Sequence, residues 1–260
     1  MRKSLIRDLI ILLTAALAIW AVFTIFPIIP DESDIDISIE QEEKLGNLIV
    51  ENILNNNPLF KQVHNEALDS SLNNIMLRLE KGIGPTDYDY KIIVFDSPTI
   101  NAAALPGGYI LIFSELIKVT DNPEELTAVL AHEIAHIEKR HVIARLIKEL
   151  GLSILTSGDS MVLAEVFKYT TSTAFDRRQE READEFALKL LENSQVHPFA
   201  IASIFRKFKE KSGSYNEIPE ILSTHPHNNS RIKAALKYEV DENFKSKKFD
   251  IDWERVKSVL

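Results

Sequence analysis

The feature that most constrains this 260-residue chain is a stretch of helical periodicity, residues 121–142, that carries two histidines four positions apart. Asp121 and Asn122 are residue types that cap helix N-termini, and Pro123 followed by two glutamates suits a first helical turn. Apolar residues then recur at helical spacing: Leu126, Val129, Leu130, Ile134, Ile137 and Val142. We therefore expect a capped helix that buries one apolar face.

The two histidines, His132 and His136, form an H-E-x-x-H motif with Glu133. Residues four apart lie one helical turn above each other, so both imidazoles can reach one Zn²⁺ at about 2.0–2.1 Å. Glu133 follows the first histidine and points beside the metal, where its carboxylate can take a proton from a zinc-bound water. The motif therefore predicts one zinc ion per chain with a general base next to it.

A catalytic zinc site needs a third protein ligand and an open position for water. His141 lies five residues past His136, which turns it away from the shared face, so we expect it at the surface or behind a ligand. A second amphipathic helix over 174–191 carries Glu180 and Asp184 four apart on one face. A glutamate ligand beside an aspartate that orients a ligating histidine is a sensible arrangement around zinc.

Two further segments accompany these motifs: N-A-A-A-L-P-G-G-Y at 101–109, and S-T-H-P at 223–226 with R-I at 231–232. In this order, over roughly residues 90–235, the four motifs resemble the M48 zinc metallopeptidases. That group includes the heat-shock membrane protease HtpX, the CAAX prenyl protease, and periplasmic and mitochondrial quality-control proteases. The resemblance implies a gluzincin-type, mostly helical α+β domain with a small sheet.

The resemblance also implies roles for individual residues. His132, His136 and Glu180 would be the zinc ligands, Glu133 the general base, and Asp184 a partner behind the ligands. An exposed strand edge can pair with an extended peptide through backbone hydrogen bonds, and the resemblance assigns such substrate contact to the segment before the histidine helix. The residues predicted for this contact are Asn101, Ala103, Pro106, Gly107, Gly108 and Tyr109.

His225 is the residue of the downstream motif with chemistry to offer. Pro226 restricts it to a non-helical, extended conformation. By resemblance it is a catalytic residue whose imidazole donates to the oxyanion that forms when water adds to a peptide carbonyl. Alternatively, it occupies the open zinc position and holds the enzyme closed until substrate arrives.

Residues 9–29 form an uncharged, predominantly apolar run near the N-terminus. A helix of about 20 apolar residues spans a bilayer, so this run predicts a membrane anchor in contact with lipid. Basic residues precede the run and acidic residues follow it within 31–36, which places the N-terminus in the cytoplasm and the remainder on the periplasmic or cell-surface side. A signal peptide cleaved near 16–18 is the alternative, but it would leave an apolar stub at the mature terminus.

Charge and cysteine content exclude several classes of protein. The net charge is −9, and residues 1–30 hold Arg2, Lys3, Arg7 and Asp8, so the remainder carries −11. A part this acidic has no electrostatic reason to bind nucleic acid, and its partners are expected to be proteins. The absence of cysteine excludes disulfides, thiolate metal sites and a lipoprotein anchor.

The remaining patterns predict helices at 40–57 and 62–81, and strands at 90–95, 100–105 and 109–113, the last two joined by a tight hairpin. We expect the stretch 150–175, too charged to span a membrane, to form a helix-loop-helix that covers the cleft.

The predicted domains are an anchor at 1–30, a peptidase domain at 31–240 and a tail at 241–260 packed on it. The sequence thus predicts a membrane-anchored zinc endopeptidase that acts on damaged or misassembled envelope proteins. The alternative is a membrane-tethered chaperone or assembly factor whose zinc site is structural or closed.

Overall fold

The computed structural model describes residues 8, 11–17, 20, 37–57, 60–214, 219–226 and 229–260. The chain divides into two units, Met1–Ile37 and Ser38–Leu260. In the first unit, residues 11–17 are helical. No helix within the described ranges combines the length and the apolar character needed to cross a bilayer. Most of the run 9–29 and its charged flanks lie outside the described residues, so the anchor remains a prediction.

The second unit contains one four-stranded sheet in the order β1-β2-β4-β3. Its strands are β1 (Lys61–Gln62), β2 (Lys91–Asp96), β3 (Ala102–Ala104) and β4 (Tyr109–Phe113). The predicted hairpin is confirmed, because β3 and β4 run antiparallel with Ala103 opposite Leu111. Strand β2 pairs with β4 in parallel, and β1 pairs with β2 antiparallel. Strand β3 is therefore an edge strand of this sheet.

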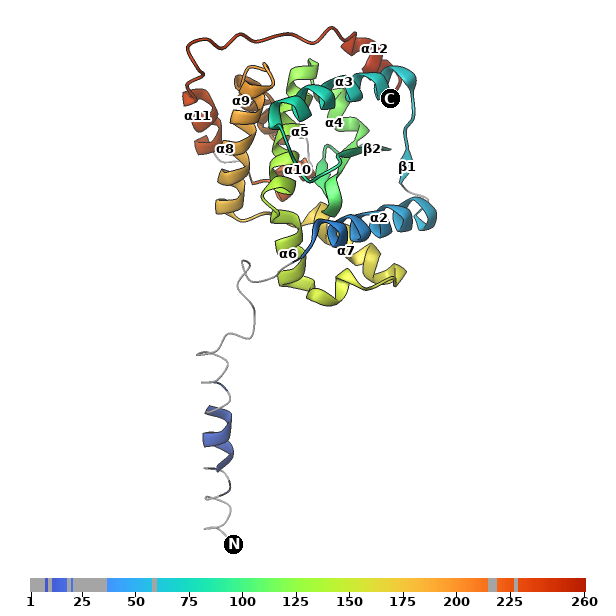
Figure 1. Cartoon of the computed structure of the whole chain (residues 1–260), viewed down its shortest axis with the longest axis vertical. Coiled ribbons are helices and arrows are strands. Elements are labelled where there is room, and N and C mark those ends of the chain that lie inside the picture. Colours follow the sequence, from blue (N-terminus) through green and yellow to red (C-terminus); the bar gives the residue numbers. More distant parts are fainter. Residues whose placement is uncertain are drawn as a thin grey trace. The chain divides into compact units, whose positions relative to one another are not determined.

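Helices make up most of the second unit and surround the sheet (Figure 1). They are α2 (Ile39–Asn56), α3 (Glu66–Ile83), η2 (Pro106–Gly108), α4 (Ser114–Val119), α5 (Pro123–Glu138), α6 (His141–Leu150), η3 (Leu152–Leu155), α7 (Ser160–Ser172), α8 (Arg177–Asn193), α9 (Phe199–Ser214), α10 (Glu220–Thr224), α11 (Asn229–Lys237) and α12 (Trp253–Ser258). A mostly helical unit with a small sheet confirms the predicted α+β class.

Helix α3 begins later than its apolar spacing predicts. The Asn65 side chain accepts a hydrogen bond from Ala67 N at 2.9 Å and caps the helix there. Gln62, expected to be the first residue of this helix, instead lies with Lys61 in β1, and the two residues pair with Phe95 and Asp96 of β2. A side-chain cap and a strand partner together override the helical pattern of the preceding residues.

Helix α5 is buried more completely than one apolar face would require. Every residue from Glu125 to Ile137 is buried, because α5 contacts α8 and α9 as well as β3 and β4, and Figure 1 shows it at the centre of the unit. Asn122 caps the helix, its Oδ1 accepting from Glu125 N at 3.0 Å. The predicted start of the helix is therefore correct, and the motif it carries lies inside the domain.

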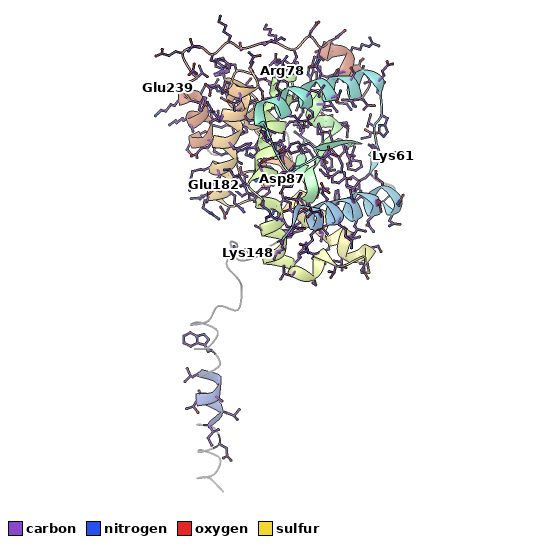
Figure 2. All side chains as sticks on the ribbon, in the orientation of Figure 1. Lys61, Arg78, Asp87, Lys148, Glu182 and Glu239 are labelled. Carbon is purple, nitrogen blue, oxygen red and sulfur yellow. The ribbon has the colours of Figure 1, made fainter. Side chains whose placement is uncertain are left out.

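The C-terminal residues lie against α3. Arg78 donates to the carbonyl oxygens of Lys247 (2.6 Å) and Lys248 (3.2 Å), and its guanidinium lies 3.5 Å from the ring centroid of Phe249. Figure 2 labels Arg78 on α3 beside this segment. Trp253 is buried and donates from Nε1 to Thr120 Oγ1 at 3.2 Å. Aromatic and backbone contacts thus hold the last residues on the domain.

Candidate metal centre

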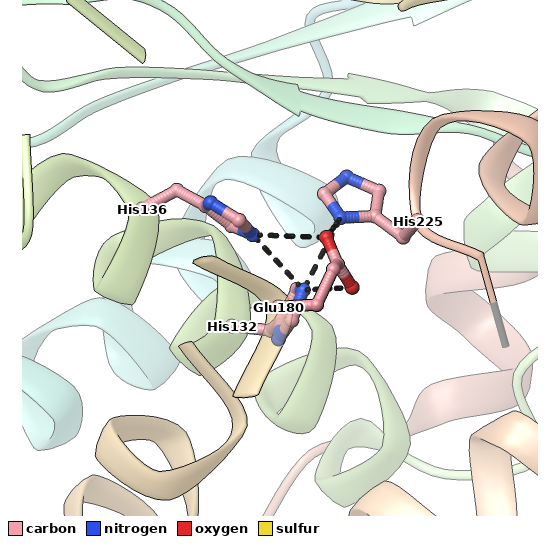
Figure 3. A group of neighbouring side chains, drawn as sticks. All are labelled: His132, His136, Glu180 and His225. Atoms are coloured by element: carbon pink, nitrogen blue, oxygen red, sulfur yellow. Dashed lines mark hydrogen bonds and ion pairs between the residues drawn. The ribbon is translucent and has the colours of Figure 1, made fainter. Parts of the chain in front are cut away.

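Four buried side chains from α5, α8 and the residue after α10 meet inside the domain (Figure 3). They are His132, His136, Glu180 and His225, and one potential ligand atom from each lies within 4.8 Å of the others. The Nε2 atoms of His132 and His136 are 3.2 Å apart, and Nδ1 of His225 lies 2.9 Å from Oε1 of Glu180. The structure thus brings together the three predicted zinc ligands and adds His225 to them.

The cap at the N-terminus of α8 determines the position of Glu180. Asp176 and Gln179 form a capping box at the start of α8, in which the Asp176 carboxylate accepts from Gln179 N at 2.9 Å. Glu180 is therefore in the first turn of α8 and faces the two histidines of α5. Just before the cap, Phe175 N donates to Thr224 O at 3.2 Å, which holds the end of α10 next to the start of α8.

The donor set suits zinc. Three imidazole nitrogens and a carboxylate oxygen are ligand types that Zn²⁺ takes, and they are buried together as a tetrahedral site requires. When deprotonated, these groups would offer lone pairs to a cation at the centre of the cluster. Burial lowers the pKa of His136 well below its usual value, which keeps its imidazole neutral as a metal ligand must be.

Arg231 compensates the charge of two buried carboxylates of α8, Glu180 and Asp184. Its Nε and Nη2 each donate to Asp184 at 2.6 Å, and its Nη1 contacts Oε2 of Glu180. Burial opposes ionisation of both acids, but their cationic and hydrogen-bonding neighbours outweigh it and hold the pKa of Asp184 below its usual value and that of Glu180 well below. Asp184 Oδ1 lies 3.3 Å from Nδ1 of His132, where a partner behind that ligand was predicted.

Glu133 is next to the cluster without being part of it. Its Oε2 accepts from Ala104 N of β3 at 2.9 Å, which fixes the carboxylate. Its Oε1 is buried, has no hydrogen-bond partner within the described part of the chain, and lies 3.4 Å from Nε2 of His225. One oxygen is therefore held by the edge strand and the other faces the site, which suits the role predicted for a general base.

The residues predicted to contact substrate have structural roles here. Asn101 and Ala103 are buried, and the Asn101 amide donates to Thr171 O at 3.2 Å. Gly107 has φ +73°, and a Cβ there would lie 2.4 Å from Cα of Glu43 in α2.

The rest of the turn is also packed. Pro106 and Gly108 are buried, and Tyr109, half-buried, donates from its hydroxyl to Asn47 Oδ1 at 2.6 Å. The turn sequence is thus explained by close packing, of Gly107 on α2 and of Gly108 on Asp89. Substrate contact along this segment stays a prediction.

His141 is buried, so the prediction that it lies at the surface is wrong. The other prediction, that it lies behind a metal ligand, is correct in that it contacts His136. Its Nδ1 lies 3.1 Å from Nδ1 of His136, and its Nε2 lies 3.0 Å from Glu182 Oε2. The spacing of five residues between His136 and His141 gave a wrong prediction because α5 ends before it reaches His141. Arg140 adopts a left-handed conformation (φ 55°) that ends α5 and turns His141 back towards His136.

An aromatic and a cationic side chain complete the surroundings of His136. The Phe175 ring stacks on the imidazole with centroids 3.7 Å apart, and the Arg145 guanidinium lies 3.8 Å from the Phe175 centroid. Phe175, Arg145 and the role of Arg231 were not predicted from the sequence. The sequence did contain a signal for Arg231, because this residue belongs to the R-I pair of the downstream motif. The sequence contained no signal for Phe175 and Arg145, because only the tertiary fold brings them to the site.

The chain also matches a family model and several known proteins. The model of peptidase family M48 matches residues 66–239. The beta-barrel assembly-enhancing protease of Yersinia pestis is 28% identical over 229 residues, which is 81% of this chain and 46% of the relative. The protein of the same name from Escherichia coli (strain K12) is 26% identical over 260 residues, covering 90% of this chain and 53% of the relative.

A mitochondrial relative matches over a shorter span. The mitochondrial metalloendopeptidase OMA1 of Bos taurus is 31% identical over 170 residues, 58% of this chain and 32% of the relative. The chain spans about half the length of the beta-barrel assembly-enhancing proteases it matches. The predicted enzyme class, a zinc metalloendopeptidase, agrees with the family and with the names of these relatives. Since the family model covers most of the chain, this protein belongs to peptidase family M48.

Proposed function

We propose that this protein is a zinc-dependent endopeptidase whose metal is held by His132, His136 and Glu180. The observation that carries the proposal is the convergence of these three buried side chains with a carboxylate, Glu133, fixed beside them. Zinc, when bound, supplies a Lewis acid that polarises the scissile carbonyl and lowers the pKa of water towards about 7. The other steps belong to residues of the chain.

Glu133 takes the proton of the attacking water and passes it to the leaving amine. The hydrogen bond from Ala104 N holds Oε2, so Oε1 faces the site throughout. Since Ala104 belongs to the edge strand β3, a peptide added along this strand would lie close to the base. Asp184, held by Arg231, orients His132 from behind.

The substrates we propose are damaged or misassembled envelope proteins. Support comes from relatives whose name is beta-barrel assembly-enhancing protease and from the apolar run 9–29, which would anchor the chain with its peptidase domain on the extracytoplasmic side. Pairing along β3 uses the peptide backbone, so it would select unfolded segments rather than a particular sequence.

A second function is favoured by one observation. His225 contributes a fourth potential ligand to the cluster, with Nδ1 3.2 Å from Nε2 of His132. A zinc site with four protein ligands leaves no position for water and would be structural or closed. In that state the protein would act as an assembly factor rather than as a peptidase.

Replacing Glu133 by Gln separates these functions. We expect the purified full chain to bind one zinc with either residue, and casein cleavage to fall by about 10²–10⁴-fold in Glu133→Gln, because the base is lost while the ligands remain. Glu124→Gln, on the first turn of the same helix, is the matched control and should cleave as wild type does. Zinc in both proteins with cleavage in neither would favour the closed site, and no zinc in either would refute the proposal.

A further inference from the structure

The second ring nitrogen of His136 has an unusual neighbour. A histidine that binds a metal through one nitrogen commonly donates its other N–H to a carboxylate, a backbone carbonyl or water. His132 has such a carboxylate, because Asp184 Oδ1 lies 3.3 Å from its Nδ1. Nδ1 of His136 instead faces Nδ1 of another buried histidine, His141, at 3.1 Å.

The direction of the hydrogen bonds follows from the far end of this pair. A carboxylate can only accept a hydrogen bond, so Nε2 of His141 must donate to Glu182 Oε2 at 3.0 Å. A neutral imidazole that donates from Nε2 has a lone pair on Nδ1. His141 therefore accepts at Nδ1, and His136 donates to it from its own Nδ1.

We infer that His141 and Glu182 are positioning residues that fix His136 in the tautomer whose Nε2 lone pair points at the metal cluster. The opposite direction would put the proton of His136 on Nε2, where it would point into the cluster and block ligation. The inference rests on the proposed function in one respect, that Nε2 of His136 binds the metal. It assigns a task to two residues that no catalytic step uses.

The chain is built to hold this arrangement. Arg140 turns left-handed between α5 and α6, and its Nε and Nη2 donate to Glu42 Oε1 at 2.8 and 2.6 Å, which secures the turn. His141 is thereby the first residue of α6 and faces back towards α5. Glu182 comes from the outward side of α8, where its side chain is 39% exposed (Figure 2). A buried ligand is thus linked through one imidazole to a carboxylate at the surface.

Two substitutions at His141 separate a hydrogen-bonding role from a packing role. Asn offers Oδ1 close to the position of the imidazole Nδ1 and can accept from His136, whereas Leu fills similar space without an acceptor. We expect zinc affinity of the full chain, measured by competition with a chelator, to fall about 10–100-fold in His141→Leu and to stay close to wild type in His141→Asn. Equal losses in the two variants, with unchanged circular dichroism, would overturn the inference.

A second pair of variants lies on α8 and leaves the buried residues intact. Glu182→Ala removes the acceptor that sets the tautomer of His141, so zinc affinity should fall, by at most about tenfold because water can replace the exposed carboxylate. Glu185→Ala, exposed on the same helix, is the matched control and should bind as wild type does. Unchanged affinity in Glu182→Ala would count against the relay.

Long-range ¹H–¹⁵N spectra of the metal-free chain give a readout that does not depend on zinc. We expect the Nδ1–H tautomer for His136 and the Nε2–H tautomer for His141 in wild type, and a mixture at His136 in His141→Leu. An Nε2–H tautomer for wild-type His136 would overturn the relay. Failure of the wild-type chain to bind zinc would refute the proposed function instead, so the two failures are distinguishable.

Discussion

The two sides of the metal centre are built by different kinds of structure. Two long helices, α5 and α8, with side-chain caps at their N-termini, present His132, His136 and Glu180. His225, by contrast, follows α10, a helix of 5 residues. Helices shorter than about 12 residues have little stability of their own, so the position of His225 depends on its neighbours.

Backbone hydrogen bonds with other elements hold α10 in place. Ile221 N donates to Ile100 O and Phe175 N donates to Thr224 O, both at 3.2 Å, and each bond holds α10 from outside. Two capped helices therefore position the helical side, while hydrogen bonds from other elements position the α10 side. This difference predicts that removing His225 leaves the other three side chains of the cluster in place.

The largest effect is expected at Arg231, which connects Glu180 and Asp184 of α8 to α11. Arg231→Met would leave Glu180 and Asp184 buried without their cation, and breaking a buried ion pair from one side costs about 3–5 kcal/mol. We expect the free energy of unfolding of the metal-free chain to fall by this amount at pH 7, measured by chemical denaturation. Lys233→Met, exposed on the same helix, should change it little. A loss below about 1 kcal/mol would show that these acids are not ionised in the fold.

The pH dependence of the same variant has a definite sign. In wild type the pKa values of Glu180 and Asp184 lie below their usual values, so the stability they contribute is present above those usual values and is lost as pH falls through the folded-state pKa. Without Arg231, Asp184 loses the largest influence that lowers its pKa, whereas Glu180 keeps His225 and His136 beside it. Burial would then raise the pKa of Asp184, and the stability that this residue contributes would be lost as pH rises through the raised pKa. The difference between the two proteins should therefore shrink from pH 7 to pH 4 in thermal unfolding of the metal-free chains.

An intermediate effect is expected at His225, on the side held by fewer bonds. The Nδ1 of His225 lies with the potential ligand atoms of the cluster. His225→Ala should therefore lower zinc affinity by at least about 10–100-fold, which is the loss expected when a residue that supports a metal ligand is removed. If His225 competes with water for the fourth zinc position, casein cleavage at saturating zinc should rise in this variant, since that position becomes free for water. His64→Ala, at an exposed histidine, is the control. A loss of cleavage at unchanged affinity would instead assign His225 to the oxyanion.

The same division separates what the sequence predicted from what it did not. His132, His136 and the Glu180–Asp184 pair could be predicted because a spacing of four within one helix is a local geometric fact. His225 came only from resemblance to a family, since its place depends on a segment some ninety residues after the helix it meets.

His141 shows how a local rule fails. The spacing of five was interpreted along a continuous helix, but the left-handed Arg140 ends α5 and reverses the direction of the side chain. A positive φ at a non-glycine residue is uncommon and has no clear signature in a single sequence. The contacts of Arg231 and Phe175 join distant elements, so they too required the fold.

The smallest effect is expected at Phe175, which contacts both sides of the centre. Its ring stacks on His136 at 3.7 Å and lies 5.4 Å from the ring of His225. Phe175→Leu keeps the backbone bond to Thr224 but removes the stacking, which is worth about 0.5–1.5 kcal/mol beyond area burial. Chemical denaturation should show a loss of that order plus the lost burial, and Phe186→Leu, half-buried on α8, is the comparison.

Combining Phe175→Leu with His225→Ala tests whether the two sides are coupled through this ring. If Phe175 transmits the position of α10 to His136, the double variant should depart from additivity in zinc affinity, by about 0.5 kcal/mol or more as contacting residues do. Additive effects on zinc affinity would mean that α5 and α8 position their ligands independently of α10. In that case the three ligands from α5 and α8 form a complete site on their own, and His225 is a separate cover over it.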